Sequence, residues 1–426
     1  MALHIGIGGN FLDYGGGTER AVLFIANTMV MRGHRVTLFC AESPGASLGF
    51  NVQQGVQYCP VSKSDAHENL AVVRQNLREA GLDAFVALSA GGQHLFWAVA
   101  LLGTGVPYIY SERSCPELVE MEWSRAGRLA CMSGADAIVL LFDAFRSSLP
   151  EFLSEKSVVI PNAAPEGGGE QPCVCGEKPG SFTLASLGRL AEVKQLHLLI
   201  EAFARLESRF PDWNMDIWGS GPEETALKHS LKRFGASRVH LRGVSRDACS
   251  VFRAADLFCI PSAYEGFPNA ALEALACGAP VVGFAACPGV NSLIKDGVNG
   301  VLAPEMTAAS LAAALERVMS DGAFRGALAK GALTTAGQYA PGEVAQRWED
   351  LFYAVAAKKG HTVMDGFHDE PFASMARLSA AARREYLFRN FGDPYPGTWA
   401  YYQSKGLSSL SRWMNMALKV CGYFNR

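Results

Sequence analysis

The sequence predicts an α/β protein of two domains, each a parallel β-sheet flanked by helices. Short apolar runs alternate with segments of helical spacing from the first residues onward, and this order produces parallel sheets covered by helices. The alternation breaks off in a Gly- and Pro-rich stretch at Ala163–Ser181 and resumes from Phe182 to about Gly283. With 426 residues, 49% of them hydrophobic, the chain can bury two ordinary cores.

The domain limits follow from this break. We expect a first domain at 1–163, a linker at 164–180, a second domain at 181–340, a closing helix at 341–359 and a C-terminal extension at 360–426. In the first domain, strands are expected at Ile5–Gly8, Val36–Cys40, Phe85–Leu88, Tyr108–Ser111 and Ala137–Leu141. Helices are expected between them at Thr18–Arg32, which ends at a glycine, and at Gln93–Leu102.

The second domain shows the same alternation. One helix carries a buried apolar stripe of Leu196, Leu199, Ile200, Phe203 and Leu206. Further along, Leu257–Ile260 is an apolar strand, Pro261–Gly266 has turn residues, and Asn269–Cys277 has helical spacing that stops at Gly278 before a second buried strand. The turn therefore lies at the carboxyl end of a parallel strand, where open α/β sheets bind ligands.

Two glutamates flank this turn and the helix that follows. Glu265 lies on the turn, and Glu273 lies one turn into the helix. Ionised carboxylates only accept hydrogen bonds, so the pair suits a ligand rich in hydroxyl donors, such as a sugar ring and a ribose. Taken singly, Glu265 also fits a solvated loop, and Glu273 fits a favourable charge near a helix N-terminus.

The block from Glu265 to Glu273, with Gly-Phe-Pro between the glutamates and Cys-Gly-x-Pro-Val-Val after them, resembles the E-x7-E signature of retaining glycosyltransferase family 4. The resemblance covers roughly Ile5–Ala357 and implies the GT-B fold, with two Rossmann-like domains facing a central cleft. It implies that Glu265 grips the donor hexose and that Glu273 holds the ribose. The turn between them, which consists of Gly266, Phe267, Pro268 and Asn269, would border the donor. Phe267 and Asn269 would offer their backbone amides to the donor hexose.

Two cations follow the first strand of the second domain. Arg189 and Lys194 come after the strand end and before the Leu196 helix, where fixed donors stabilise a departing diphosphate. Removing one such donor typically costs roughly 3 kcal/mol. A solvated loop with two charges is the competing interpretation. Family 4 enzymes carry a similar Gly-Arg-Leu and a following Lys that contact the donor phosphates.

Three glycine-containing turns complete the expected donor site. The turn that contains Gly219 and the turn that contains Val244 resemble turns that line the nucleotide pocket in the family. A tight strand-to-helix turn alone also explains Gly219. In the first domain, Gly16 and Gly17 open a helix whose amides suit a diphosphate or an acceptor. A dinucleotide fingerprint is excluded there, because position 11 is Phe.

The stretch Ser-Glu112-Arg113-Ser ends another strand of the first domain. Many family 4 enzymes have a histidine in this neighbourhood. The Ser-Glu-Arg variant resembles members that extend polyprenyl-diphosphate-linked or surface glycans, and it implies that Glu112 or Arg113 contacts the sugar or the acceptor. Pairing of Glu112 with Arg113 at a helix entrance is the alternative.

Charge and cysteine content exclude several classes. The net charge of -3 argues against a nucleic-acid binder. The 11 cysteines lack metal-ligand spacing, apart from the weak pair Cys173 and Cys175, so we expect reduced thiols, a cytoplasmic location and no metal or other cofactor. No signal peptide is apparent, and the most apolar run, Leu95–Val106, is too short to span a membrane.

Residues from about 360 onward lie outside the resemblance. They carry an apolar stripe beside unopposed basic residues, which suits peripheral contact with an anionic membrane at the inner face of the cell membrane. Packing of this helix back across the domains is the alternative. The stripe consists of Leu407, Leu410, Trp413, Met414, Ala417, Val420, Cys421 and Phe424.

These observations lead to one functional hypothesis. The chain is expected to move a hexose or N-acetylhexosamine, with retention and without a metal, from a nucleotide diphosphate sugar to a hydroxyl of a growing glycan. UDP is expected over GDP, and the acceptor is expected to be lipid-linked or a surface polysaccharide. Arg189 and Lys194 would hold the leaving phosphate. A GT-B sugar-nucleotide epimerase and a non-catalytic partner subunit remain as alternatives.

Overall fold

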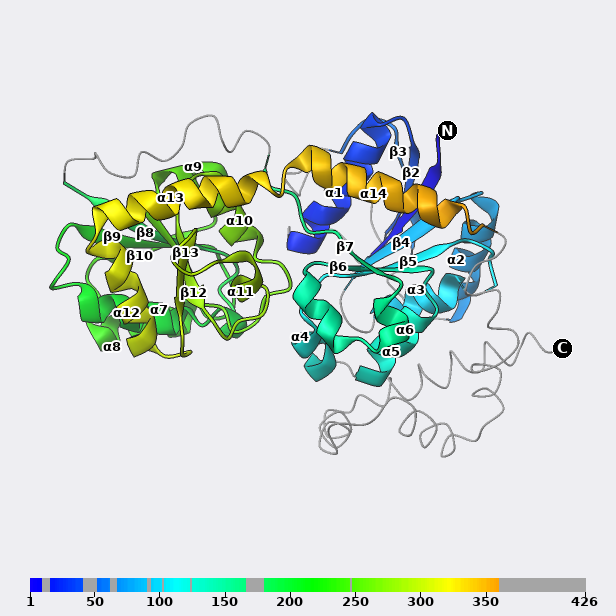
Figure 1. Cartoon of the computed structure of the whole chain (residues 1–426). Coiled ribbons are helices and arrows are strands. Elements are labelled where there is room, and N and C mark those ends of the chain that lie inside the picture. Colours follow the sequence, from blue (N-terminus) through cyan, green and yellow to red (C-terminus); the bar gives the residue numbers. More distant parts are fainter. Residues whose placement is uncertain are drawn as a thin grey trace. The chain divides into compact units, whose positions relative to one another are not determined.

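The computed structural model describes residues 1–9, 16–40, 52–61, 67–89, 93–101, 103–122, 125–165, 180–245 and 247–359. The chain divides into two compact units (Figure 1). Unit 1 comprises Met1–Ile160 and the chain from Ala345 onward, and unit 2 comprises Pro161–Val344. Most of the predicted linker, at 166–179, and the whole extension at 360–426 lie outside the described residues, as do Cys173 and Cys175.

Within the described residues, unit 1 contains a parallel sheet with strand order β3-β2-β1-β4-β5-β6-β7. The strands are β1 His4–Gly8, β2 Arg35–Cys40, β3 Val56–Pro60, β4 Ala84–Ser89, β5 Tyr108–Glu112, β6 Ala137–Leu140 and β7 Ser157–Val159. The predicted strands all form. The edge strand β3 was not predicted, because its residues are largely exposed and form no apolar run.

Helices cover the unit 1 sheet on its two faces (Figure 1). They are α1 Gly17–Met31, α2 His67–Glu79, α3 Gln93–Leu101, α4 Pro116–Glu122, α5 Arg125–Ser133 and α6 Glu151–Ser154, with a 3-10 turn at Asp143–Ser148. The closing helix α14, Pro341–Ala356, begins in unit 2 and belongs to unit 1 from Ala345 on. It buries Trp348 and Phe352 and pairs Glu349 with His34, with Nε2 2.9 Å from Oε1.

Unit 2 repeats the architecture. Its described residues form a parallel sheet of order β10-β9-β8-β11-β12-β13. The strands are β8 Phe182–Leu187, β9 Trp213–Trp218, β10 Val239–Gly243, β11 Leu257–Ile260, β12 Val281–Phe284 and β13 Gly300–Ala303. The helices are α7 Leu196–Leu206, α8 Glu224–Phe234, α9 Ala248–Ala254, α10 Asn269–Ala276, α11 Val290–Leu293, α12 Ala308–Met319 and α13 Gly322–Gly337.

The two parallel sheets confirm the predicted α/β class. The α7 stripe is buried at all five expected positions, and β11 has the predicted bounds. In unit 2 the chain builds β8, β9 and β10 toward one edge of the sheet and then β11, β12 and β13 toward the other. The order reverses between β8 and β11, and such a switch point binds ligands at the carboxyl ends of its two strands. No helix among the described residues is long and apolar enough to span a bilayer.

Candidate functional site

The loops that follow β8 and β11 meet at the switch point of unit 2. The two strands are adjacent and parallel, with Leu257 opposite Leu184, so both loops emerge at the same edge of the sheet. The Ala263 amide donates to the Val193 carbonyl at 2.8 Å and joins the loops directly. The first loop carries Arg189 and Lys194, and the second carries Glu265.

Lys194 and Glu265 form an ion pair at this edge. Nζ of Lys194 lies 2.5 Å from Oε1 of Glu265, and Oγ of Ser262 donates to the same oxygen at 2.7 Å. The two side chains retain 28% and 12% exposure, so solvent or a ligand still reaches them. The structure therefore brings together two predicted site residues that are 71 positions apart. A phosphate at this place would compete with Glu265 for the lysine.

The residue after Lys194 has an unusual backbone. Gln195 has φ +45°, the only positive φ at a non-glycine position in the described part of the chain. It ends the 3-10 turn Glu192–Lys194 and begins α7, and its amide donates to the Glu192 carbonyl at 2.9 Å. A left-handed conformation costs a residue with a Cβ about 1–2 kcal/mol. The surrounding loop thus holds Gln195, the residue after Lys194, in a strained backbone conformation, as is common at ligand sites.

Gly219 packs against the loop that carries Arg189. A Cβ at Gly219 would lie 1.8 Å from the Gly188 carbonyl oxygen, so only glycine fits there. Its amide donates to the Gly243 carbonyl at 2.7 Å. Gly219 was expected to let the main chain approach a ligand closely, and in the structure it lets two segments of main chain approach each other. Arg189 itself is exposed, and Val244 follows β10 with 69% exposure.

The turn from Gly266 to Asn269 leads into α10. Phe267 is buried, whereas Gly266 and Asn269 are half-buried. The N-cap residue Pro268 offers no side-chain cap. The Asn269 amide, expected to face the donor, donates instead to the Phe267 carbonyl at 2.9 Å. Glu273 is half-buried on the same helix, one turn further along.

The Asn269 side chain has a partner that the sequence did not suggest. Nδ2 of Asn162 donates to Oδ1 of Asn269 at 2.7 Å. Asn162 was not among the predicted site residues, because it lies three residues past β7 in a segment without periodicity. The motif Pro-Asn just after a strand and just before the expected linker was its one sequence signal.

In unit 1, Gly16 and Gly17 open α1 as predicted. The structure places an anionic group beside them. Glu19 lies in the first turn, and a Cβ at Gly16 would lie 2.8 Å from its Oε2. A carboxylate near a helix N-terminus complements the helix dipole, so it competes with any diphosphate at this position.

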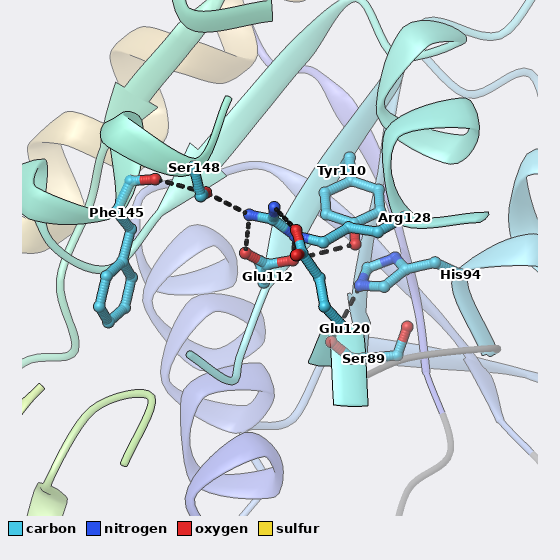
Figure 2. A network of polar contacts seen from close by, with 8 residues as sticks. All are labelled: Ser89, His94, Tyr110, Glu112, Glu120, Arg128, Phe145 and Ser148. Carbon is cyan, nitrogen blue, oxygen red and sulfur yellow. Dashed lines mark hydrogen bonds and ion pairs between the residues drawn. The ribbon is translucent and has the colours of Figure 1, made fainter. Parts of the chain in front are cut away.

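Glu112 is buried at the end of β5 and is paired with Arg128 of α5 (Figure 2). Nε of Arg128 lies 2.7 Å from Oε1, and Nη2 lies 2.8 Å from Oε2. Arg128 also donates to Glu120 and to Ser148, each at 3.0 Å, and the Tyr110 hydroxyl donates to Glu112 at 3.3 Å. Both carboxylate oxygens are thus engaged from within the fold, and the partner is Arg128 rather than the neighbouring Arg113.

Arg113 turns toward the closing helix. Its guanidinium lies 5.5 Å from the centroid of the Trp348 ring, a cation–π contact within unit 1. Burial lowers the pKa of Arg113 to about 9. The contact places Arg113 against α14, so Glu112 and Arg113, which are adjacent in sequence, pack against different helices.

His94 lies beside this network and was not predicted as a site residue. Its ring stacks on Tyr110 with centroids 3.8 Å apart, and Nε2 donates to the Ser89 carbonyl at 2.9 Å (Figure 2). Burial lowers the pKa of His94 to about 3. The imidazole is therefore neutral at physiological pH. A histidine does lie near the end of β5, but it comes from α3 rather than from the strand.

Comparison with known proteins identifies both halves of the chain. Residues 16–163 match the glycosyl transferase 4-like domain, and residues 173–334 match the glycosyl transferases group 1. An uncharacterized glycosyltransferase of Haemophilus influenzae is 26% identical over 317 residues, which are 72% of this chain and 87% of that protein. The D-inositol 3-phosphate glycosyltransferase of Salinispora tropica is 35% identical over 164 residues, and only 34% of its length is matched.

The fold also matches solved structures. Anabaena Alr3699/HepE in complex with UDP and glucose superposes with a TM-score of 0.67 at 20% identity, over 82% of this chain and 99% of that one. At this identity the likeness concerns the fold.

Proposed function

We propose a reaction for this chain, which is a GT-B glycosyltransferase with a glycosyl transferase 4-like domain and a glycosyl transferases group 1 domain. It transfers a hexose or N-acetylhexosamine from a nucleotide diphosphate sugar to a hydroxyl of a growing glycan. The observation that carries the proposal is the ion pair of Lys194 and Glu265 at the switch point of unit 2. The UDP and glucose bound to the Anabaena neighbour support UDP as the nucleotide.

The ion pair suits a donor that carries both phosphate and hydroxyl groups. Before the donor binds, Glu265 neutralises Lys194. A diphosphate would draw Lys194 toward itself, because phosphate oxygens accept strong charge-assisted hydrogen bonds. Oε1 of Glu265 would then be available to a sugar hydroxyl. One exchange of partners would thus engage the leaving group and the sugar together.

The start of α10 supports the same donor position. Because Pro268 provides no side-chain cap, the first-turn amides after Asn269 remain suited to an electronegative ligand atom. Glu273 lies one turn further on and would accept from the ribose hydroxyls. The exposed side chain of Val244 would offer apolar surface to the base.

The proposed reaction retains the configuration at the anomeric carbon. The acceptor oxygen forms a bond to that carbon on the face from which the diphosphate departs, and the bond to the phosphate oxygen breaks. The leaving phosphate takes the proton of the acceptor hydroxyl. Arg189 and Lys194 would balance the charge that develops on the diphosphate, so this proposal needs no metal.

For the acceptor we propose a lipid-linked glycan or a surface polysaccharide, and for the C-terminal extension a contact with the membrane surface. The Ser-Glu-Arg sequence at the end of β5 resembles that of family 4 members that extend such glycans, and this resemblance supports the first proposal. The apolar stripe with neighbouring basic residues past residue 360 supports the second. The resulting enzyme would work at the inner face of the cell membrane.

The test is transfer by the purified full-length chain. UDP- and GDP-sugars are supplied with polyprenyl-diphosphate-linked and free oligosaccharide acceptors, with and without a chelator, and the anomeric configuration of the product is read by NMR. We expect a retained linkage from a UDP-sugar, insensitive to the chelator. An epimerised sugar nucleotide formed without acceptor, or nucleotide binding without turnover under every condition, would contradict the proposal.

A further inference from the structure

The chain connects its two units through two segments, and inside unit 2 these segments lie together. The first follows β7 and begins at Pro161, and the second follows α13 and includes the start of α14, where unit 2 ends at Val344. The Ala164 amide donates to the Tyr339 carbonyl at 2.8 Å. A backbone hydrogen bond therefore joins the incoming segment to the outgoing one.

Both segments also contact the turn that precedes α10. Asn162 of the incoming segment donates to Oδ1 of Asn269 at 2.7 Å. Tyr339 of the outgoing segment packs edge-on against Phe267, with ring centroids 5.7 Å apart. One side chain of each connecting segment, Asn162 or Tyr339, thus contacts the turn.

These contacts determine what the turn presents. Asn269 is the first residue of α10, and its Oδ1 accepts the hydrogen bond from Asn162, while the N-cap residue Pro268 offers no side-chain cap. Phe267 is buried against Tyr339 and anchors the backbone between Gly266 and Pro268. The position of the turn, and of the first α10 amides, depends on the connecting segments as well as on β11 and α10.

We infer that Asn162 is a positioning residue for the donor turn, and that the Asn162–Asn269 and Tyr339–Phe267 contacts link donor binding to the segments that connect the units. The inference rests on the proposed function for the identity of the ligand. By linkage the effect is reciprocal: a donor that holds the turn also holds the segments, and a loosened segment weakens donor binding.

The variants separate positioning from folding. Asn162→Ala removes the hydrogen bond, and Tyr339→Leu removes the aromatic contact while keeping the backbone carbonyl. Asn162→Asp is the conservative rescue, because the Asn269 carboxamide can rotate and donate to the new carboxylate. Asn214→Ala is the matched control, since Asn214 makes an exposed hydrogen bond to Ser181 at the start of β9.

The measurements are UDP affinity and backbone hydrogen exchange of the full chain. In the wild type, UDP should slow exchange in peptides covering 161–165 and 338–344. In Asn162→Ala the affinity should fall about five- to tenfold, the size of one lost hydrogen bond, and the protection of both peptides should be reduced. Tyr339→Leu should act in the same direction, Asn162→Asp should recover most of the affinity, and Asn214→Ala should behave as wild type.

Two outcomes would overturn the inference in distinguishable ways. If the wild type binds UDP, and both Asn162→Ala and Tyr339→Leu keep its affinity and its UDP-dependent protection, the segments are not linked to the donor site, even if the variants melt earlier. If the wild type binds no nucleotide at all, the proposed function fails and this inference falls with it.

Discussion

The ammonium of Lys194 lies 2.5 Å from Oε1 of Glu265, and this ion pair joins the loops that follow β8 and β11. Ser262 donates to the same oxygen and helps to hold the carboxylate in place. Each partner is a group that a sugar nucleotide would need, a cation for phosphate and an acceptor for a hydroxyl. The confirmed GT-B fold places the pair at the switch point of unit 2.

Lys194→Ala should lower kcat more than it changes donor KM. The lysine would meet charge that grows as the diphosphate leaves, so its loss affects the transition state more than the bound donor. We expect a reduction of about 100-fold or more in steady-state kcat. Lys228→Ala is the control, because Lys228 is an exposed partner of Glu224 on α8. Equal kcat in Lys194→Ala and the wild type would remove Lys194 from the proposed role.

Glu273→Ala should weaken binding of the donor. A hydrogen bond from a ribose hydroxyl to a carboxylate contributes about 1.5–3 kcal/mol, so the dissociation constant of UDP should rise about tenfold or more. Calorimetric titration with UDP measures this. Glu224→Ala on α8 provides the matched surface change. An unchanged dissociation constant in Glu273→Ala would contradict the assignment to the ribose.

Arg128→Ala should destabilise unit 1. The substitution leaves Glu112 buried without its partner, and breaking a buried ion pair in this way costs about 3–5 kcal/mol. Urea unfolding followed by hydrogen exchange of peptides from the unit 1 strands measures the loss. Arg205→Ala, which breaks an exposed pair with Glu201, should change stability by less than about 1 kcal/mol. Similar losses in both variants would mean that burial of the Glu112–Arg128 pair is energetically unimportant.

Gln195→Gly should raise stability and lower activity. Glycine adopts the positive φ freely and removes about 1–2 kcal/mol of strain, of which its greater freedom in the unfolded chain offsets roughly half. The same freedom loosens Lys194, so kcat should fall. The melting temperature and kcat of one preparation give both values. A lower melting temperature would show that the Gln195 side chain contributes more than its backbone strain costs.

His94 should make unit 1 less stable as the pH falls from about 6.5 toward 3. Its pKa is lowered to about 3 in the folded chain by burial, so the unfolded chain binds the proton first. Within this window the free energy of unfolding should fall by up to about 1.4 kcal/mol for each pH unit. Urea unfolding between pH 4 and 7 should show a shallower slope for His94→Gln than for the wild type. Equal slopes in His94→Gln and the wild type would contradict the argument.

Much of the fold could be predicted from local patterns. The α7 stripe and the strand β11 form where their periodicity indicated, because burial of one face is encoded by residue spacing. The position of Glu265 at the carboxyl end of β11 followed from the order of strand, turn and helix. The exposed edge strand β3 could not be found in this way, since it contributes little apolar surface to a core.

By itself the sequence determined the α/β class, the alternation of elements in both halves and the motifs at 189–194 and 265–273. Only the tertiary structure decided which groups these motifs meet. Lys194 pairs with Glu265, Asn269 with Asn162, and Glu112 with the more distant Arg128 rather than with its neighbour Arg113. The physical reason is that periodicity specifies which face of an element is buried, whereas a polar partner depends on which loops the parallel sheet brings to one edge.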